Sequence, residues 1–332
     1  METLEATETR LELARETIER FRRDLDALVG PEVPIGIAVS GGPDSLALLL
    51  MAAEVRPGKI EAATVDHALR PESRSEAEMV TRICEQIGVQ HRILTASWEE
   101  KPATAIQERA RAMRYRLLGQ WAAERGLKAL LTAHHLDDQA ETLLMRFARG
   151  AGIRGLAGMR RIASTPGGRI ALLRPLLGWR RSELEAVCGA SGFEPAEDPS
   201  NADEQFERVR VRKALREIEW LDPEAIAASA AHLAQAETAL QWATTQEWER
   251  WVTVGEGTIV YRPSDAPREI RRRIVRRAVI ALATEGQGSE LRGRELNQVL
   301  AALLAGRSAT LRGVLCLGGA EWRFTPAPPR RN

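Results

Sequence analysis

Apolar positions near the start of the chain follow the spacing of a helix. Between residues 4 and 28 they recur among charged residues at intervals of three, four and seven, which predicts an amphipathic helix leading into the core. Pro31 and Pro34 follow this stretch and end the helix, because proline cannot continue a helical hydrogen-bond ladder. Residues 1–30 are therefore one predicted element ahead of the main domain.

Beyond these prolines, short apolar runs alternate with longer amphipathic stretches. The runs predict strands over residues 35–39, 60–65, 89–94 and 129–132. The stretches between them predict helices from residue 44, over 73–87 and 103–125, and over 136–147. Strands that alternate with helices imply right-handed βαβ units. We therefore predict an α/β fold with a Rossmann-like parallel sheet covered by helices on both faces.

The strand pattern becomes rare in the second half of the chain. Residues 170–177 predict one more strand or extended segment, and 180–191 a helix. A heptad-like recurrence of Ile226, Leu233 and Leu240 predicts one long helix over 222–250 that bridges two domains. Further on, the pattern predicts helices over 268–283 and 290–304 and a small hairpin formed by 309–317 and 322–324. The second domain is thus expected to be smaller and mainly helical.

Composition narrows the class of protein. The 332 residues are 44% hydrophobic and 28% charged, enough for one sizeable core and a smaller second domain. No run approaches the roughly 20 apolar residues of a membrane span, and the start is acidic where a signal peptide is basic, so we expect a cytoplasmic protein. Cys84, Cys188 and Cys316 lie far apart, which argues against a zinc knuckle or an iron–sulfur cluster.

The first chemical motif is a glycine loop between a strand and a helix. Ser40-Gly41-Gly42-Pro43-Asp44-Ser45 directly follows the run 35–39 and precedes an apolar helix. Glycines allow the backbone to approach phosphates closely, and helix N–H groups then face the anion. The loop is not a Walker A motif, because no lysine occurs before Lys59. The alternative is a simple Gly-Gly turn with a capped helix.

Two further segments carry candidate nucleotide contacts. Asp66, His67 and Arg70 close the second strand and emerge at the same edge of the sheet as the glycine loop. His67 is equally well explained as a histidine satisfied at a strand end. Arg111 and Arg114 share one helix face at i, i+3 spacing, although that spacing alone favours a solvated basic face.

The run from His134 to Thr142 is dense in ionisable groups and opens a helix. Asp137 and Glu141 stand at i, i+4 on one side, with Asp138 between them. Carboxylates near a helix start can be caps favoured by the helix dipole, but two histidines and three acids exceed what capping needs. A zinc site is disfavoured, because the two histidines are adjacent and no third soft ligand is near.

The glycine loop matches Ser-Gly-Gly-x-Asp-Ser and so resembles the signature of the PP-loop ATP pyrophosphatases, which cleave ATP between its α and β phosphates. The other segments sharpen the likeness: with Arg146–Met159, Arg174–Leu177 and Asp198–Asn201, the chain over about 33–215 resembles the tRNA(Ile)-lysidine synthetases. That resemblance implies a PP-loop ATPase domain over 31–220, a linker helix with a tRNA-binding domain over 221–325, and a disordered tail over 326–332.

The same resemblance implies a two-step ligation. The wobble cytidine of the CAU anticodon of an isoleucine tRNA attacks the α-phosphate of ATP, and free L-lysine then displaces AMP. Ser40, Ser45 and the glycine amides would hold the pyrophosphate, while Asp44 would hold Mg²⁺ or cap the helix. Arg111 and Arg114 would stabilise charge at the α-phosphate. As hypotheses, Asp137 and Glu141 bind the lysine ammonium and His134 lies near the nucleotide.

The resemblance implies contacts with tRNA, and arginine, which supplies almost all of the positive charge, suits phosphates and base edges, although composition alone favours RNA binding little. The candidates are Arg146, Arg149, Arg154, Arg208 and Arg212 near the cavity, with Arg272 and Arg276 on a later helix. A solvated basic helix face is the alternative for the later cluster. Competing functions are tRNA thiolation, small-molecule amidation and nucleotide binding without turnover. The oligomeric state stays open, with a homodimer as one option.

Overall fold

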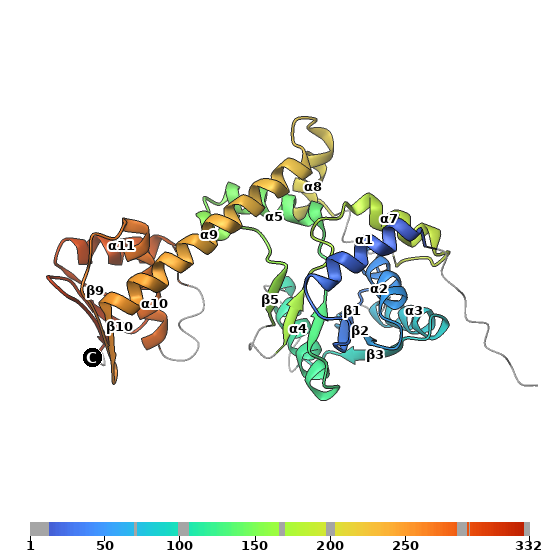
Figure 1. The fold of residues 1–332 in the computed structure, drawn as a ribbon, viewed down its shortest axis with the longest axis horizontal. Helices are drawn as coiled ribbons and strands as arrows, with labels where there is room; N and C mark the ends of the chain where they lie inside the picture. The colour runs from blue at the N-terminus through green and yellow to red at the C-terminus, as the bar shows by residue number, and fades with distance from the viewer. Residues whose placement is uncertain are drawn as a thin grey trace, which may run out of the picture. The chain divides into compact units, whose positions relative to one another are not determined.

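The computed structural model describes residues 13–69, 72–98, 106–165, 170–196, 203–283, 291 and 293–328 (Figure 1). Arg70, a predicted nucleotide contact, lies outside the described residues. The chain divides into two compact units, one up to Ala234 and one from Gln235 onward. The division falls inside a single long helix, α9 (Pro223–Trp251).

The N-terminal unit is built on a six-stranded sheet with the order β3-β2-β1-β4-β6-β5. Its strands are β1 (Ile35–Ala38), β2 (Ile60–Asp66), β3 (Gln90–Thr95), β4 (Ala129–Leu131), β5 (Ile162–Ser164) and β6 (Ala171–Leu173). Every pairing is parallel except that of β5 with β6. The predicted α/β fold with a parallel sheet is therefore confirmed. The antiparallel edge strand β5 was not predicted, because three residues give no periodic signal.

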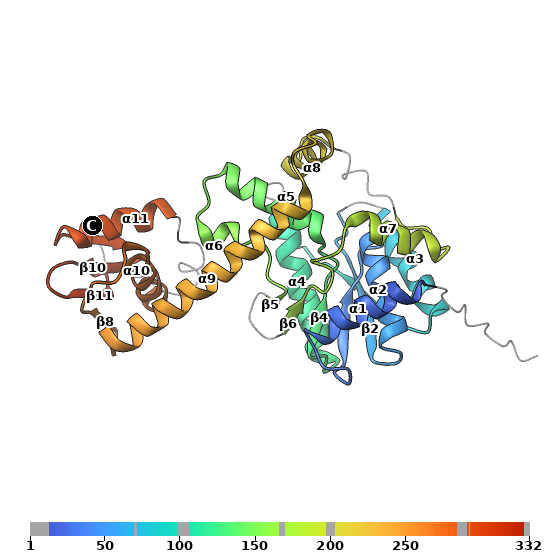
Figure 2. The same ribbon diagram turned by 45° about the horizontal axis from the view of Figure 1, so that its top comes forward.

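Helices cover both faces of this sheet (Figure 2). The helices of this unit are α1 (Arg15–Asp26), α2 (Pro43–Val55), α3 (Glu72–Gln86), α4 (Ile106–Glu124), α5 (Leu136–Ala148), α6 (Ile153–Leu156), α7 (Arg181–Ala190) and α8 (Glu207–Glu217). One core joins α1, α2, α3 and α7 to the sheet, and a second core joins α4 to the other face. Side chains on β1 alternate between the two: Ile35 and Ile37 belong to the first, whereas a Cβ on Gly36 would come within 2.8 Å of Trp121 in the second.

The N-terminal helix α1 is part of this core. Phe21 is fully buried and packs edge-on against Trp179, with ring centroids 6.4 Å apart. The indole N–H of Trp179 donates to Asp24 at 2.9 Å. The contact between the two buried rings and the hydrogen bond of the indole N–H therefore hold α1 against the segment before α7.

The strand order creates a crevice at the carboxyl ends of β1 and β4. The chain runs from β1 outward to β2 and β3, and then returns to the opposite side of β1 to form β4. The connections after β1 and β4 consequently leave in different directions. Such a switch point is where open α/β sheets bind ligands.

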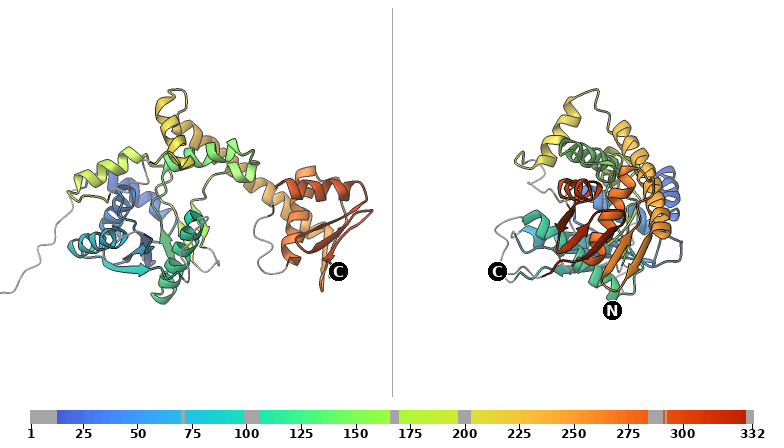
Figure 3. Two further views of the ribbon diagram at one scale, coloured as in Figure 1. Left: turned by 180° about the vertical axis from the view of Figure 1, so that it is seen from behind. Right: turned by 90° about the vertical axis from the view of Figure 1, so that its left-hand side faces the viewer.

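The C-terminal unit combines helices with a five-stranded antiparallel sheet of order β7-β8-β11-β10-β9. Its strands are β7 (Val252–Gly255), β8 (Thr258–Tyr261), β9 (Ser308–Leu311), β10 (Val314–Leu317) and β11 (Trp322–Pro326). The helices α10 (Arg268–Leu282) and α11 (Gly293–Leu304) pack against it (Figure 3). The predicted hairpin of 309–317 with 322–324 is wrong in its first arm, because a turn at Arg312-Gly313 divides that stretch into β9 and β10. The strands β10 and β11 pair as predicted, within this larger sheet. No helix among the described residues is long and apolar enough to cross a membrane.

A histidine on β3 joins three elements of the N-terminal unit. His91 Nε2 lies 2.9 Å from Thr64 Oγ1 on β2, and its Nδ1 lies 2.9 Å from Thr81 Oγ1 on α3. Burial lowers the pKa of His91 from 6.5 to about 4. The ring is therefore neutral in the folded protein at pH 7.

This shift predicts a pH-dependent contribution to stability. Between pH 6.5 and about 4 the unfolded chain binds a proton at His91 that the folded chain does not, so the free energy of unfolding should fall as the pH falls through this window. His91→Gln should flatten this part of the profile in urea denaturation at a series of pH values. His232→Gln, at an exposed position of α9, is the matched control. Parallel pH profiles for wild type and His91→Gln would contradict the prediction.

Candidate functional site

The loop after β1 is closed by its own hydrogen bonds. Ser45 Oγ accepts from the Ser40 amide at 3.1 Å and donates to the Gly42 carbonyl at 3.0 Å. Gly41 has a φ of +90°, which an L side chain rarely adopts, and a Cβ there would lie 3.3 Å from Met79. Gly42 is the N-cap of α2 and provides no side-chain cap. The first amides of α2 are therefore left for an anion.

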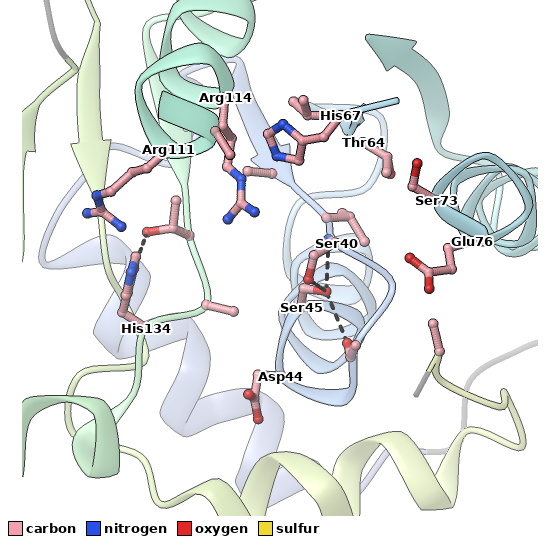
Figure 4. Close-up of a pocket in the computed structure, with 18 of the residues that line it drawn as sticks. Ser40, Asp44, Ser45, Thr64, His67, Ser73, Glu76, Arg111, Arg114 and His134 are labelled. Carbon is pink, nitrogen blue, oxygen red and sulfur yellow. Dashed lines mark hydrogen bonds between the residues drawn. The ribbon is translucent and has the colours of Figure 1, made fainter. Parts of the chain in front are cut away.

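A cavity of about 630 Å³ opens beside this loop at the carboxyl ends of β1, β2 and β4 (Figure 4). Its volume lies within the usual range for small-molecule sites. The predicted site residues on its wall are Ser40, Gly42, Pro43, Asp44, Ser45, His67, Arg111, Arg114, His134, Asp138 and Arg212. Residues from five separate parts of the chain thus meet around one space.

Asp66 is not on the cavity wall but supports a neighbour that is. Its Oδ1 accepts from the Ala68 amide at 2.9 Å and from Ser73 Oγ at 2.5 Å. Ala68 has a φ of +52°, a strained conformation that these bonds hold in place. The carboxylate of Asp66 therefore shapes the turn that carries His67.

Two arginines of α4 reach into the cavity opposite the glycine loop (Figure 4). The Arg111 guanidinium lies 5.0 Å over the ring of Tyr115, which is buried. Arg114 lies near His67, whose ring nitrogens are buried and have no hydrogen-bond partner among the described residues. Burial lowers the pKa of His67 to about 4, and the charge of Arg114 adds to this shift. His67 is thus a neutral polar group available to a ligand.

His134 also lines the cavity, and its ring is neutral at pH 7. Burial lowers the pKa of His134 to about 4, although the carboxylate of Asp138 works in the other direction. Its Nδ1 lies 3.0 Å from Thr132 Oγ1. This bond fixes the orientation of the ring toward the cavity.

Asp44 carries an unsatisfied oxygen suited to a cation. Its Oδ1 is buried and has no hydrogen-bond partner among the described residues, whereas Oδ2 lies 3.5 Å from His135 Nε2. Asp138 stands on the same cavity wall. The described residues contain no cluster of three or more metal-ligating side chains. One or two carboxylates are what Mg²⁺ uses when nucleotide phosphates and water complete its coordination, so the residues fit Mg²⁺ bound with a nucleotide.

The residue that sequence analysis missed is His135. Its side chain is 1% exposed and stands at the N-cap of α5. Burial lowers the pKa of His135, but the hydrogen bonds with Asp137 and Asp44 and the charge of Asp138 outweigh it and raise the pKa to about 10. An Asp138 amide at 3.4 Å from Nδ1 would favour an unprotonated Nδ1, but this contact is at the long limit of a hydrogen bond. Three surrounding carboxylates make the cationic form the better description.

Asp137 and Glu141 share a side of α5 but bind different neighbours. Asp137 accepts from the Arg181 amide at 2.8 Å and lies 3.2 Å from Arg180, so it caps α7. Burial raises the pKa of Asp137, but His135 and these contacts hold it well below its usual range. Glu141 is 1% exposed and pairs with Arg212 at 2.7 Å.

Arg208 also pairs with Glu141, at 3.0 Å, so two arginines of α8 meet one buried carboxylate of α5. A buried carboxylate needs such partners, because removal from water is costly for an unpaired charge. The pair brings Arg212 to the cavity wall. The predicted RNA contact Arg212 is thus part of the cavity, whereas Arg208 is not.

The other predicted RNA-binding arginines differ in the contacts that they already make within the protein. Arg146 donates to the Gly155 carbonyl at 2.7 Å, and Arg149 pairs with Glu207. Arg272 makes a bidentate pair with Glu269, and Arg276 lies half-buried on α10. Arg154 is exposed and forms no ion pair in the part of the chain that the structure describes.

Solved structures share the architecture of this chain. A U34-tRNA thiolase, NcsA from Methanococcus maripaludis with its [4Fe-4S] cluster, superposes with a TM-score of 0.54 at 16% sequence identity. The superposition covers 68% of this chain and 80% of the thiolase. At that identity the likeness concerns the fold alone.

Relatives found by sequence have a much higher identity to this chain than the thiolase has. A tRNA(Ile)-lysidine synthase of Novosphingobium aromaticivorans is 48% identical over 316 residues, which span 94% of each chain. Another, from Zymomonas mobilis, is 43% identical over 300 residues, which span 90% of each chain. A family model described as the PP-loop domain matches residues 15–218. The chain therefore belongs to the PP-loop family and, within it, to the tRNA(Ile)-lysidine synthases.

Proposed function

We propose that the protein joins L-lysine to C2 of the wobble cytidine in a CAU-anticodon isoleucine tRNA, with ATP converted to AMP and pyrophosphate. The observation that carries the proposal is the meeting of the open α2 N-terminus with Arg111, Arg114 and Asp138 around one cavity. Membership of the tRNA(Ile)-lysidine synthases supplies the substrate class. The product changes decoding from AUG to AUA.

The first step is adenylation of the cytidine. The open amides of α2, with Ser40 and Ser45, bind the β and γ phosphates, and attack at the α-phosphate then releases pyrophosphate. Negative charge that develops at the α-phosphate is stabilised by Arg111 and Arg114 across the cavity. Asp44 would hold Mg²⁺, which contributes further positive charge at the phosphates.

The second step requires a free lysine with a neutral amine. The side-chain ammonium has a pKa of about 10.4 in water, so the site must bind it and accept a proton before attack. Asp137 and Glu141 stay our candidates for binding the ammonium. Because Arg180 contacts Asp137 and two arginines contact Glu141, the incoming ammonium competes with guanidinium groups.

Thiolation is the weaker alternative. A thiolating enzyme needs a reactive cysteine or a cluster near the nucleotide. All three cysteines are buried, and burial raises the pKa of both Cys84 and Cys316 to about 12. None of the three lines the cavity.

The central test is direct. Incubation with ATP, labelled lysine and a CAU-anticodon isoleucine tRNA should make lysine covalent to the RNA, with equal amounts of AMP released. The same tRNA with uridine at the wobble position is the control and should yield neither product. AMP formation that proceeds without tRNA would contradict the proposal and would favour small-molecule amidation.

Competition between lysine and Arg180 predicts opposite effects for two variants. Asp137→Asn should raise the KM for lysine by about 10-fold, because a charge-assisted contact is lost. Arg180→Ala should lower the KM, since it frees Asp137 Oδ1. Lysine-independent pyrophosphate release should stay normal in both. An unchanged KM in both variants would show that Asp137 only caps α7.

Electrostatic contact with tRNA can be tested at the exposed Arg154. Each neutralised phosphate steepens the salt dependence of binding, so Arg154→Ala should weaken tRNA binding several-fold and lower the logarithmic salt slope by about one. Arg92→Ala is the matched control, since Arg92 is similarly exposed on β3 and pairs with Glu124. Filter binding at several salt concentrations measures both. Equal slopes for the two variants would exclude Arg154 from the tRNA surface.

A further inference from the structure

His135 stands where two carboxylates of the cavity approach each other. Its Nε2 lies 3.5 Å from Asp44 Oδ2 on α2 and 3.6 Å from Asp138 Oδ2 on α5. The two acids come from segments more than 90 residues apart, and both line the cavity. The ring is almost completely buried.

The direction of the contact at Nε2 follows from chemistry alone. Ionised carboxylates only accept hydrogen bonds, so Nε2 must carry the proton. Both separations are at or beyond the long limit of a hydrogen bond, so each contact is an electrostatic attraction between the ring N–H and a carboxylate. The other ring nitrogen, Nδ1, lies 3.6 Å from Asp137 Oδ2 and 3.4 Å from the Asp138 amide at the start of α5. Nε2 thus faces the two cavity acids, and Nδ1 faces the start of α5.

The contact also decides which oxygen of Asp44 is left for a ligand. Oδ2 faces His135, whereas Oδ1 is buried and has no partner among the described residues. A carboxylate without this contact could rotate and could be pushed away by the negative charge of Asp138. Contact with the ring instead fixes which oxygen of Asp44 stays unpartnered among the described residues.

We propose that His135 is a positioning residue that holds Asp44 and Asp138 in the arrangement that receives Mg²⁺ and ATP. This inference rests on the proposed function, because it requires the cavity to bind the nucleotide. The competing explanation is that His135 only caps α5, in which case the contact with Asp44 has no effect on nucleotide binding.

Two amide variants separate these roles. The side-chain amide of asparagine reaches about as far as Nδ1 of histidine, and that of glutamine about as far as Nε2. His135→Asn therefore keeps a good N-cap but loses the donor to Asp44, whereas His135→Gln keeps the donor and loses the better cap. Thermal denaturation of both variants reports capping, and nucleotide binding reports the bridge.

Binding of the α,β-methylene analogue of ATP, measured by calorimetry over a range of Mg²⁺ concentrations, provides the test. Loss of an outer contact to a metal ligand typically costs about 10-fold or more in affinity, so His135→Asn should bind the Mg²⁺-nucleotide at least about 10-fold more weakly. His135→Gln should stay within about threefold of wild type, although its thermal midpoint should be the lower of the two. In the double variant His135→Asn with Asp44→Asn, the two losses of affinity should not add in full, because His135 acts partly through Asp44.

The outcomes distinguish the two proposals. Wild-type binding with unchanged affinity in His135→Asn would overturn the positioning role and leave the proposed function intact. Affinity that falls in both single variants in proportion to their thermal midpoints would also overturn it, in favour of capping. Failure of the wild-type protein to bind the analogue at all would overturn the proposed function and this inference with it.

Discussion

An uncapped helix end at the middle of a parallel sheet is the constraint on which the site depends. Helix α2 begins directly after the central strand β1, and its first amides have no side-chain partner. Free amides at a helix start attract an anion, since the helix dipole adds to their partial charges. Closure of the loop by Ser45 and the left-handed Gly41 keeps these amides pointed at one place. The charged side chains of α4 and α5 contribute to the site because they line the same cavity as these amides.

The charges around the cavity are arranged in two layers. Arg111 and Arg114 face the cavity beside the glycine loop, while acids stand at the start of α5. Behind them, a second set of ion pairs holds the helices together, with Glu141 bound to arginines of α8. A buried carboxylate is costly without partners, so these pairs also fix where α8 lies on α5. Glu141 is therefore an architectural charge in the structure, in addition to our candidate role for it in binding the lysine ammonium.

The C-terminal unit shows why an arginine-rich sequence is a weak guide to an RNA surface. Arg273 is 11% exposed and pairs with the buried Glu237, and Arg277 stacks over Trp248. These two arginines of α10 therefore stabilise the packing of the C-terminal unit. Only arginines outside such pairs can release counterions on meeting a phosphate backbone.

The sequence by itself determined the strands β1 to β4, the helices α2 to α5, the glycine loop and the family, but not α6, β5 or α8. These are local features: apolar runs, a strand followed by Ser-Gly-Gly, and motifs whose residues are neighbours in the chain. Tertiary structure decided which polar groups share the cavity. His135 meets Asp44, Glu141 meets Arg212, and Asp66 turns away to support a loop. The strands β5 and β7 were missed because they are sheet edges with mostly exposed side chains, so neither forms a buried apolar run like that of β4, and the adjacent β8 was missed with β7. Contacts between distant segments depend on how helices pack on the sheet. The spacing of residues along the chain does not determine that packing.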